Sequence, residues 1–354
     1  MGVRFRLAHL SDWHATTLEG QGRALFDPLA SLPKRLSGWA SWRLKRRAHH
    51  SVEVLEAAIR DVREQDVDAI LVTGDLTHIA LESEFKTARR QLESLGDPES
   101  VFLIPGNHDC YVPVPIERSW DYWAPFLSGS SAEDFLQAVA SKPAGDAANK
   151  IDPRIVGSLS SQSPGRATRA PRYDEFPTLR FFGRLAVVGL CSSIPTPIFR
   201  AWGELGVQQL ERLEGLLDAL DEQGFARVVL IHHPVVATDE GARRGLRDGQ
   251  ELLAILSRTG ADLVLHGHKH RRRVHLVDGP AAAEGDGRTQ IPIVGVPSSS
   301  EVGSRPEKRA QYHVFTVEQD EGSRRFGVDV EVHGYDPASG RFAPVEDALF
   351  QAKA

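Results

Sequence analysis

Five short apolar runs in this sequence each end at a group of polar residues whose side chains can bind metal ions or exchange protons. The runs are rich in Val, Ile and Leu, as short buried strands are. In an α/β sheet, loops at the carboxyl ends of strands converge on one crevice, so polar residues there can share a site although they lie far apart in sequence. The runs are residues 7–10, 69–73, 101–104, 228–231 and 263–265, and the groups that follow are Asp12-x-His14, Gly74-Asp75, Gly106-Asn107-His108-Asp109, His232-His233-Pro234 and Gly267-His268-x-His270.

The segments between and after these runs predict an α/β fold. Apolar residues recur at helical spacing in residues 50–64, 82–95, 206–220 and 248–258, which alternate with the expected strands. After the last polar group, we expect strands of a second sheet at residues 274–277, 291–296, 312–317 and 326–332. Because the first and last polar groups must meet at one site, residues 3 to about 335 should form one unit.

Each polar group is weak evidence by itself. Asp-x-His is commonly a turn or a helix cap, and Gly-Asp after a strand is common turn chemistry. His266, His268 and His270 are two positions apart and would face one side of an extended segment. Together, however, the five groups supply three carboxylates, an amide and several imidazoles, which is the donor set that two bound metal ions require.

With these groups in this order, the sequence resembles the calcineurin-like metallophosphoesterases. Their motifs are Asp-x-His, Gly-Asp, Gly-Asn-His-Asp/Glu, His-His-Pro or His-x-Pro, and Gly-His-x-His, and all five occur here between residues 8 and 270. The resemblance implies two packed sheets flanked by helices and a metal-dependent hydrolase of phosphoric esters or anhydrides. It is specific to the superfamily and not to a substrate.

The resemblance also implies a role for each donor. One metal ion would be held by Asp12, His14 and His270, the other by Asn107, His232 and His268, and Asp75 would bridge both. Oxygen donors mixed with imidazole, without thiolate, suit manganese or iron first, and zinc or cobalt as alternatives. Two such divalent ions about 3.5 to 4 Å apart would bind the phosphoryl oxygens and activate a bridging hydroxide.

Five further residues near the motifs receive expectations of their own. His108 matches the family position that faces the substrate, where it could protonate the leaving oxygen, and Asp109 could orient its imidazole. His233 would be a wall residue and His266 a structural one. No role beyond ordinary polar surface is expected for His275 or the remaining histidines.

Composition is consistent with a globular enzyme in the cytoplasm. The chain has 354 residues, 41% of them hydrophobic, so it can bury a substantial core. Cys110 and Cys191 are too few for a disulfide framework, which favours a reducing compartment. Neither a signal peptide nor a run of about eighteen apolar residues is evident. The net charge of −6 argues against general binding of nucleic acid.

An insertion at about residues 28–50 is strongly basic and carries Trp39 and Trp42. Three interpretations stay open: a solvated basic helix whose tryptophans pack on the core, a peripheral element attracted to an anionic membrane, and a clamp for a phosphate-rich nucleotide. The insertion follows the first motif and should overhang the pocket. The candidate substrate contacts are therefore Arg43, Arg46, Arg47 and, from the pocket wall, His233.

We predict one domain at residues 1–340, followed by a tail at 341–354. A second insertion, at about 111–172, should begin as a helical cap and continue as a mobile loop at 144–170. The aromatic residues of this insertion could pack a lid or stack on a base, and they are Trp120, Tyr122, Trp123 and Phe126. A loop at 278–288 is expected to be disordered at its tip.

The substrate stays open among several hypotheses. The basic segment beside the motifs favours a phosphodiester or pyrophosphate hydrolase acting on a nucleotide-linked lipid at the inner membrane face, similar to the UDP-2,3-diacylglucosamine pyrophosphatases. The first alternative is a soluble phosphodiesterase that resembles bacterial cyclic-AMP phosphodiesterases. A protein Ser/Thr phosphatase and a catalytically silent metal-bound binding module are further hypotheses, and the intact His108 counts against the latter.

Overall fold

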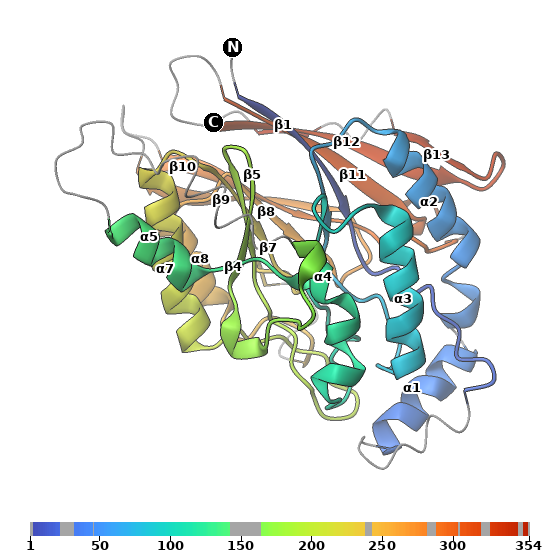
Figure 1. Cartoon of the computed structure of the whole chain (residues 1–354). Helices are drawn as coiled ribbons and strands as arrows, with labels where there is room; N and C mark the ends of the chain where they lie inside the picture. Colours follow the sequence, from blue (N-terminus) through green and yellow to red (C-terminus); the bar gives the residue numbers. More distant parts are fainter. Residues whose placement is uncertain are drawn as a thin grey trace.

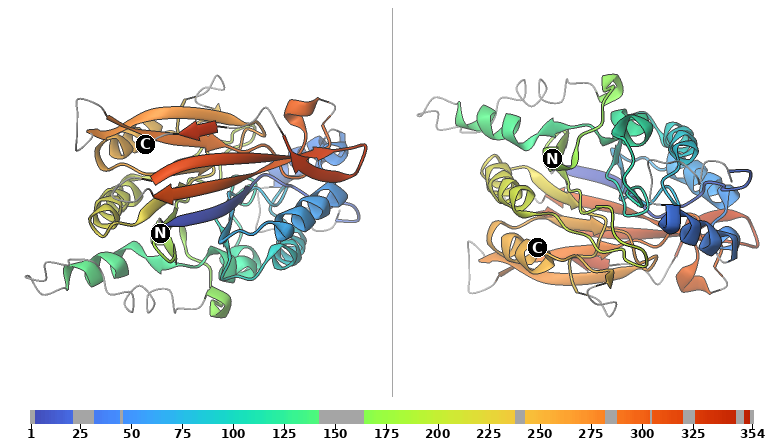
Figure 2. Two further views of the ribbon diagram at one scale, coloured as in Figure 1. Left: turned by 90° about the horizontal axis from the view of Figure 1, so that it is seen from above. Right: turned by 90° about the horizontal axis from the view of Figure 1, so that it is seen from below.

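The computed structural model describes residues 3–21, 32–44, 46–141, 164–237, 243–281, 288–303, 305–319, 326–345 and 350–352. These residues form two seven-stranded sheets that pack face to face, with helices on both outer faces (Figures 1 and 2). The expected α/β sandwich of two sheets is therefore confirmed. Most of the loop expected at 144–170 and the tip of the 278–288 loop lie outside the described residues.

The first sheet has the strand order β13-β12-β11-β1-β2-β3, and β14 also pairs with β12. Strands β1, β2 and β3 are parallel, and β11 pairs antiparallel along β1. The residues expected to form a tail thus supply two strands of this sheet. The strands are β1 (Arg4–Leu10), β2 (Ala69–Val72), β3 (Val101–Leu103), β11 (Gln311–Gln319), β12 (Phe326–Asp336), β13 (Arg341–Pro344) and β14 (Phe350–Ala352).

The second sheet has the order β4-β5-β6-β7-β8-β10-β9. The expectation that the four late strands form a sheet of their own is wrong, because β11 and β12 extend the first sheet while β9 and β10 extend the second. An apolar pattern shows that a segment is a buried strand but does not name its partner. The strands are β4 (Ser130–Ser131), β5 (Thr178–Phe182), β6 (Leu185–Gly189), β7 (Ala226–Leu230), β8 (Leu263–His266), β9 (Arg273–Ala281) and β10 (Arg288–Gly295).

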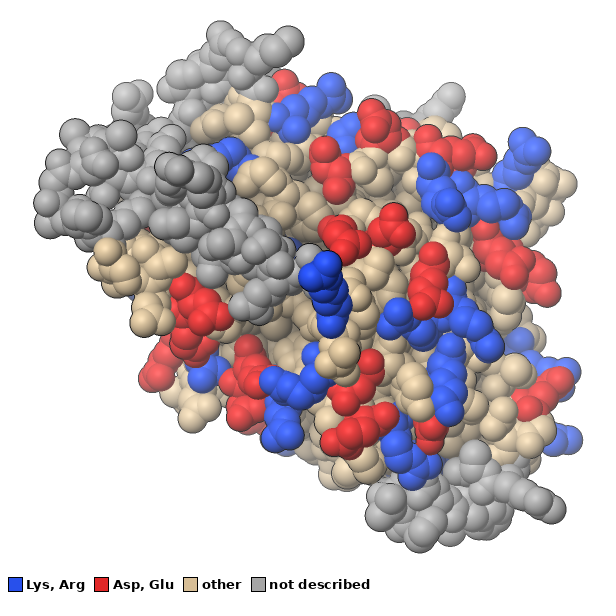
Figure 3. Space-filling view, viewed as in Figure 1, with Lys and Arg blue, Asp and Glu red and all other residues tan. Residues whose placement is uncertain are grey.

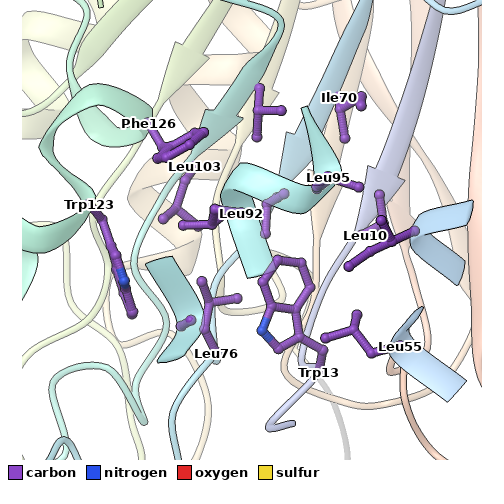
Figure 4. Packing of buried hydrophobic residues seen from close by; sticks show 14 of the residues in the cluster. Leu10, Trp13, Leu55, Ile70, Leu76, Leu92, Leu95, Leu103, Trp123 and Phe126 are labelled. Carbon is purple, nitrogen blue, oxygen red and sulfur yellow. The ribbon is translucent and has the colours of Figure 1, made fainter. Parts of the chain in front are cut away.

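Helices cover the outer face of each sheet, and alternate residues of the strands point to the two faces. In β1, Ala8 and Leu10 pack with the helices, whereas Leu7 packs between the sheets. Figure 4 shows Trp13 close to Leu10 and Leu55 in the outer cluster. Helices α2 (Val52–Glu64), α3 (Glu82–Leu95) and α4 (Ala124–Leu127) lie on the first sheet, and α5 (Ala132–Ala140), α7 (Val207–Glu222) and α8 (Gly249–Thr259) on the second (Figure 1).

The remaining helical segments are α1 (Leu32–Leu44) and short 3-10 turns. The turns are η2 (Arg46–Ala48), η3 (Ile116–Arg118), η4 (Trp120–Trp123), η5 (Pro164–Arg166), η6 (Tyr173–Glu175) and η8 (Pro306–Lys308). None of the helices in the described part of the chain is long and apolar enough to cross a membrane. On the face shown in Figure 3, basic and acidic side chains are interspersed.

The basic insertion forms α1, and part of its charge points inward. Trp42 is buried with Leu18, Ile79 and Leu81, as the core-packing interpretation expects. Lys34 is also buried, however, so the helix is not a solvated basic element throughout. The face that carries Lys34 approaches the metal-binding motifs, as the next subsection describes.

The aromatic residues of the 111–172 insertion pack beside α3. Trp123 is fully buried, its indole N–H donates to the carbonyl of Phe85 at 2.9 Å, and their rings are 4.7 Å apart. Trp120 and Phe126 belong to the same buried cluster. Of the described residues in this insertion, Tyr111 alone lines the central cavity, so the aromatic stretch forms core rather than a lid or a base-stacking surface.

Candidate metal centre

The five polar groups converge at one edge of the sandwich, around a cavity of about 680 Å³. Main-chain hydrogen bonds join their loops: Asp12 N donates to Gly74 O at 2.9 Å, and His14 N to Asp75 O at 3.2 Å. The last motif meets the first, since His268 N donates to Asp12 Oδ2 at 2.8 Å. Loops that are 256 positions apart in the sequence therefore share one site.

Potential donor atoms form two clusters that Asp75 and His14 connect. Asp12, His14 and His270 present ligand atoms within 4.8 Å of one another, and so do Asp75, His232 and His268. Asp75 Oδ2 lies 3.7 Å from His14 Nε2 in the first cluster and 3.4 Å from His232 Nε2 in the second. The carboxylate of Asp75 is thus placed where a bridging ligand would be.

The amide of Asn107 completes the second cluster. Its Oδ1 lies 3.0 Å from His232 Nε2 and 2.7 Å from His268 Nδ1. Metal–ligand bonds of about 2.0 to 2.2 Å place neighbouring donors roughly 3 to 3.5 Å apart. The separations in both clusters lie close to that range, so the residues present fit two divalent ions that prefer oxygen and imidazole.

Three of the imidazoles are oriented by backbone carbonyls. His14 Nδ1 lies 2.7 Å from Thr77 O, His232 Nδ1 2.6 Å from Thr73 O, and His268 Nε2 3.1 Å from Arg244 O. A carbonyl only accepts, so each of these nitrogens carries a proton, and the other nitrogen of each ring is the one that a metal ion could bind. Such hydrogen bonds fix the tautomer and the ring plane of metal-binding histidines.

The backbone is unusual at the same positions. Residues other than glycine rarely adopt a positive φ, and they do so mainly at sites where the surrounding structure holds them there. Five candidate donors have φ between 40° and 69°: Asp12, His14, Asp75, His268 and His270. A Cβ on Gly106 would lie 2.3 Å from Asp75 N, so the third motif needs glycine for the loops to approach this closely.

Asp109 joins the loops instead of orienting His108. Its carboxylate is buried and accepts hydrogen bonds from backbone amides of two motif loops, which corrects the expectation for this residue. Burial, together with the charge of Asp75, raises the pKa of Asp109 to about 7. The amide donors are Asp75 N at 2.8 Å, Gly106 N at 2.9 Å, Leu76 N at 3.0 Å and Thr77 N at 3.0 Å.

The imidazole of His108 faces the cavity and is held by other groups. Its Nδ1 lies 2.6 Å from His78 O, and its ring stacks on Tyr111 with 5.4 Å between centroids and 12° between planes. A ring nitrogen also lies within 4.8 Å of donor atoms of His14 and Asp75. His108 is therefore close enough to both clusters to contact a bound phosphoryl group.

Opposite charges in the clusters shift the pKa values of the donors. Burial alone would lower the pKa of His232, but the charge of Asp75 outweighs it and raises the pKa to about 9. Burial likewise opposes protonation of His270, but Asp12 raises the pKa of His270 to about 10. Burial would raise the pKa of Asp12, yet His270 brings it below its usual value. The carboxylate of Asp12 is thus held in its ionised form.

Two histidines outside the motifs belong to the same region, contrary to the expectation of ordinary polar surface. His78 is buried, and its ring stacks 5.4 Å from that of His14. His50 lines the cavity, with its ring 5.0 Å from that of His14. The position of His78 three residues after Gly74-Asp75 is the sequence signal that could have identified it.

The expected substrate contacts are mostly placed elsewhere. Arg43 lies over the Trp39 ring at 5.5 Å and Arg47 pairs with Glu19, and neither lines the cavity. The side chain of Arg46 lies outside the described residues. His233 is buried behind the site, with its ring 4.6 Å from that of His268. The lysines and arginines that do line the cavity are Lys34, Arg200, Arg244, Lys269, Arg271, Arg273 and Lys308.

This chain has a two-sheet sandwich with paired donor clusters at one edge, an arrangement that suits a hydrolase with two metal ions. The chain belongs to the calcineurin-like phosphoesterase family, whose sequence profile matches residues 5–272. It is accordingly a metal-dependent phosphoester hydrolase, and family membership implies a centre of two divalent metal ions.

Several solved structures are similar over most of the chain. A dimetal phosphatase from Danio rerio has 12% identity and a TM-score of 0.49, with 99% of each chain covered. The TT1561 protein of Thermus thermophilus has 14% identity and a TM-score of 0.38, with 92% of this chain and 98% of that chain covered. An NAD nucleotidase from Haemophilus influenzae has 10% identity and a TM-score of 0.44, with 97% of this chain and 54% of that chain covered. No curated protein matches significantly.

Proposed function

We propose that this protein hydrolyses a phosphodiester or pyrophosphate bond in a nucleotide-linked lipid such as UDP-2,3-diacylglucosamine, using the seven candidate donors to hold two metal ions. The convergence of these donors in two clusters that share Asp75 carries the proposal. Manganese or iron would polarise the phosphoryl group and acidify water for attack on phosphorus. The donors are Asp12, His14, Asp75, Asn107, His232, His268 and His270.

His108 is proposed to act directly on the substrate. Its Nδ1–H donates to His78 O, so Nε2 is the nitrogen that can hold a proton for the leaving oxygen or donate to a phosphoryl oxygen. Stacking on Tyr111 restricts rotation of the ring. Asp109 contributes indirectly, by tying the loops of Asp75 and Gly106 together.

The rim of the cavity supports an amphiphilic substrate. Basic side chains line the interior, and apolar side chains are exposed on α1 and on the loop that follows β6. Phe199 lines the cavity and is 82% exposed, whereas Ile198 and Leu36, which are 39% and 37% exposed, only precede the lining residues Phe199 and Ser37 in the sequence. A phosphate group could bind among the cations while acyl chains or the membrane surface contact the apolar rim. Peripheral contact with an anionic membrane is part of this proposal.

A soluble cyclic-nucleotide phosphodiesterase is the second candidate. The observation that favours it is the placement of the 111–172 insertion, whose described residues leave the cavity uncovered apart from Tyr111. A small soluble substrate could enter without a membrane. Neither candidate needs nucleic acid as a partner, and the silent binding module remains the outcome if no ester is cleaved.

The test is a kinetic comparison of the purified protein loaded with manganese or iron. Bis-p-nitrophenyl phosphate, cyclic AMP and UDP-2,3-diacylglucosamine are compared by kcat/KM, and bound metal is counted in the same sample. The proposal expects two ions per chain and the highest kcat/KM for the lipid-linked nucleotide. Faster cleavage of cyclic AMP would support the second candidate, and two bound ions without hydrolysis of any ester would refute both.

A further inference from the structure

Lys34 is a buried cation in the wall of the cavity. The residue is 5% exposed, although it belongs to the strongly basic insertion, for which a solvated helix was one of three interpretations. Its Nζ donates to Thr196 O at 2.6 Å and to Thr196 Oγ1 at 3.1 Å, and it lies 4.5 Å from the centroid of the Tyr111 ring. An ammonium group has three donors, so these contacts leave one N–H for another partner.

The charge of Lys34 has no acidic partner among the residues that the structure describes. Its two hydrogen-bond acceptors are neutral, and the nearby Cys110 is a buried thiol whose pKa is raised by burial. Buried lysines are nearly always paired, because removing an ammonium from water without a counter-charge is costly. Burial accordingly lowers the pKa of Lys34 to about 8.

The position of Lys34 relative to His108 is set by Tyr111. The Tyr111 ring contacts both residues, at 5.4 Å from the His108 ring and 4.5 Å from Lys34 Nζ, which places the amine within about 10 Å of His108. Helix α1 packs closely against Ile79 and Tyr111 at Gly38, where a Cβ would lie 2.6 Å from the Ile79 side chain and 2.7 Å from the Tyr111 hydroxyl. The amine is thus held against the Tyr111 ring, no more than about 10 Å from the candidate catalytic group.

We propose that Lys34 binds a second anionic group of the substrate, next to the phosphoryl group held at the metal donors, and so favours pyrophosphate-linked substrates over singly charged diesters. This inference rests on the proposed function and narrows its substrate class. The second anion supplies the counter-charge that the described residues do not provide. A charge-assisted hydrogen bond of this kind is worth about 1.5 to 3 kcal/mol, or roughly ten- to a hundredfold in affinity.

The test measures competitive inhibition of bis-p-nitrophenyl phosphate hydrolysis by uridine diphosphate and uridine monophosphate, with metal in excess. In Lys34→Met we expect the inhibition constant of uridine diphosphate to rise at least tenfold more than that of uridine monophosphate or the KM of the diester. Lys34→Arg should restore part of the preference because it keeps the charge. Arg43→Met is the matched control, since it removes a positive charge from the same helix outside the cavity.

The outcomes separate this inference from the proposed function. If Lys34→Met weakens both inhibitors and the diester equally, or leaves the preference unchanged, Lys34 only fastens α1 to Thr196 and the inference is wrong. If Arg43→Met loses as much of the preference for uridine diphosphate over uridine monophosphate as Lys34→Met does, the effect is one of general charge, and the inference about Lys34 is also wrong. Failure of the metal-loaded wild type to cleave any diester or pyrophosphate would instead refute the proposed function.

Discussion

Replacing His108 with alanine tests the residue that we propose acts directly on the substrate. Its Nδ1 is engaged by His78 O at 2.6 Å, so Nε2 would serve the substrate. A ring nitrogen of His108 also lies within 4.8 Å of donor atoms of His14 and Asp75, which makes a role as a metal ligand the competing explanation. A proton donor and a ligand differ in what their removal does to bound metal.

We expect His108→Ala to keep two ions per chain and to lose about a hundredfold or more in kcat, the usual effect of one positioned acid. This corresponds to about 2.7 kcal/mol in the activation barrier. Turnover is measured with an alkyl phosphodiester and with bis-p-nitrophenyl phosphate, and bound metal by mass spectrometry. A proton donor to the leaving oxygen should matter more for the alkyl ester, because nitrophenolate leaves without protonation. Turnover of the alkyl ester within threefold of wild type would refute the role, and one ion per chain would make His108 a ligand.

Four further predictions concern the metal donors and the scaffold. Asp75→Asn removes the shared charge of both clusters, so we expect most bound metal to be lost, and two ions per chain in a metal assay would contradict this. Gly106→Ala places a Cβ 2.3 Å from Asp75 N and should also lose metal, whereas Gly215→Ala, with its nearest atom at 4.0 Å, should not. Arg180 is buried and donates hydrogen bonds to the carbonyls of Ser128, Val101 and Pro125. We therefore expect Arg180→Met to lower the free energy of unfolding, measured in urea, by about 3 to 5 kcal/mol. Arg184→Met should lower it less, because Arg184 donates to only two carbonyls, those of Gln223 and Gly224. Hydrogen bonds from Lys86, Tyr122 and Arg118 lower the pKa of Glu82 to about 2. The ionised Glu82 therefore stabilises the folded state fully above pH 4.5, and this stabilisation is lost as the pH falls toward 2. Glu82→Gln should therefore lower the melting temperature by about 2 °C at pH 7 but not near pH 2, and an equal difference at both pH values would exclude the ion pairs as the cause.

Much of the fold and of the site could be predicted because the relevant signals are local. A run such as residues 69–73 is apolar and bounded by turn residues, and the structure has β2 there. The helices near residues 50–64 and 82–95 were predicted from spacing alone, and α2 and α3 occupy Val52–Glu64 and Glu82–Leu95. The rule that loops meet at the carboxyl ends of strands then brings the motifs together.

The parts that could not be predicted depend on contacts between distant segments. The split of the late strands between two sheets depends on pairing partners, such as His9 with His313, that no local pattern specifies. Helix α1 has basic residues on several faces, and only its docking on the rest of the chain buries Lys34 against Tyr111 and Thr196 and Arg35 against Ala80 while it leaves Arg43 outside. Composition alone could not separate these residues.

Two kinds of interaction hold this site, and they predict different consequences of substitution. Main-chain bonds such as Asp12 N to Gly74 O and His14 N to Asp75 O join the loops without using the donor side chains. Substitution of a donor such as His14 should therefore remove a ligand while the loops stay in place. Asp109 differs because its carboxylate is itself the link between loops, through four backbone amides. Removing it leaves those buried donors unsatisfied at about 1 to 3 kcal/mol each, so the loops themselves should separate.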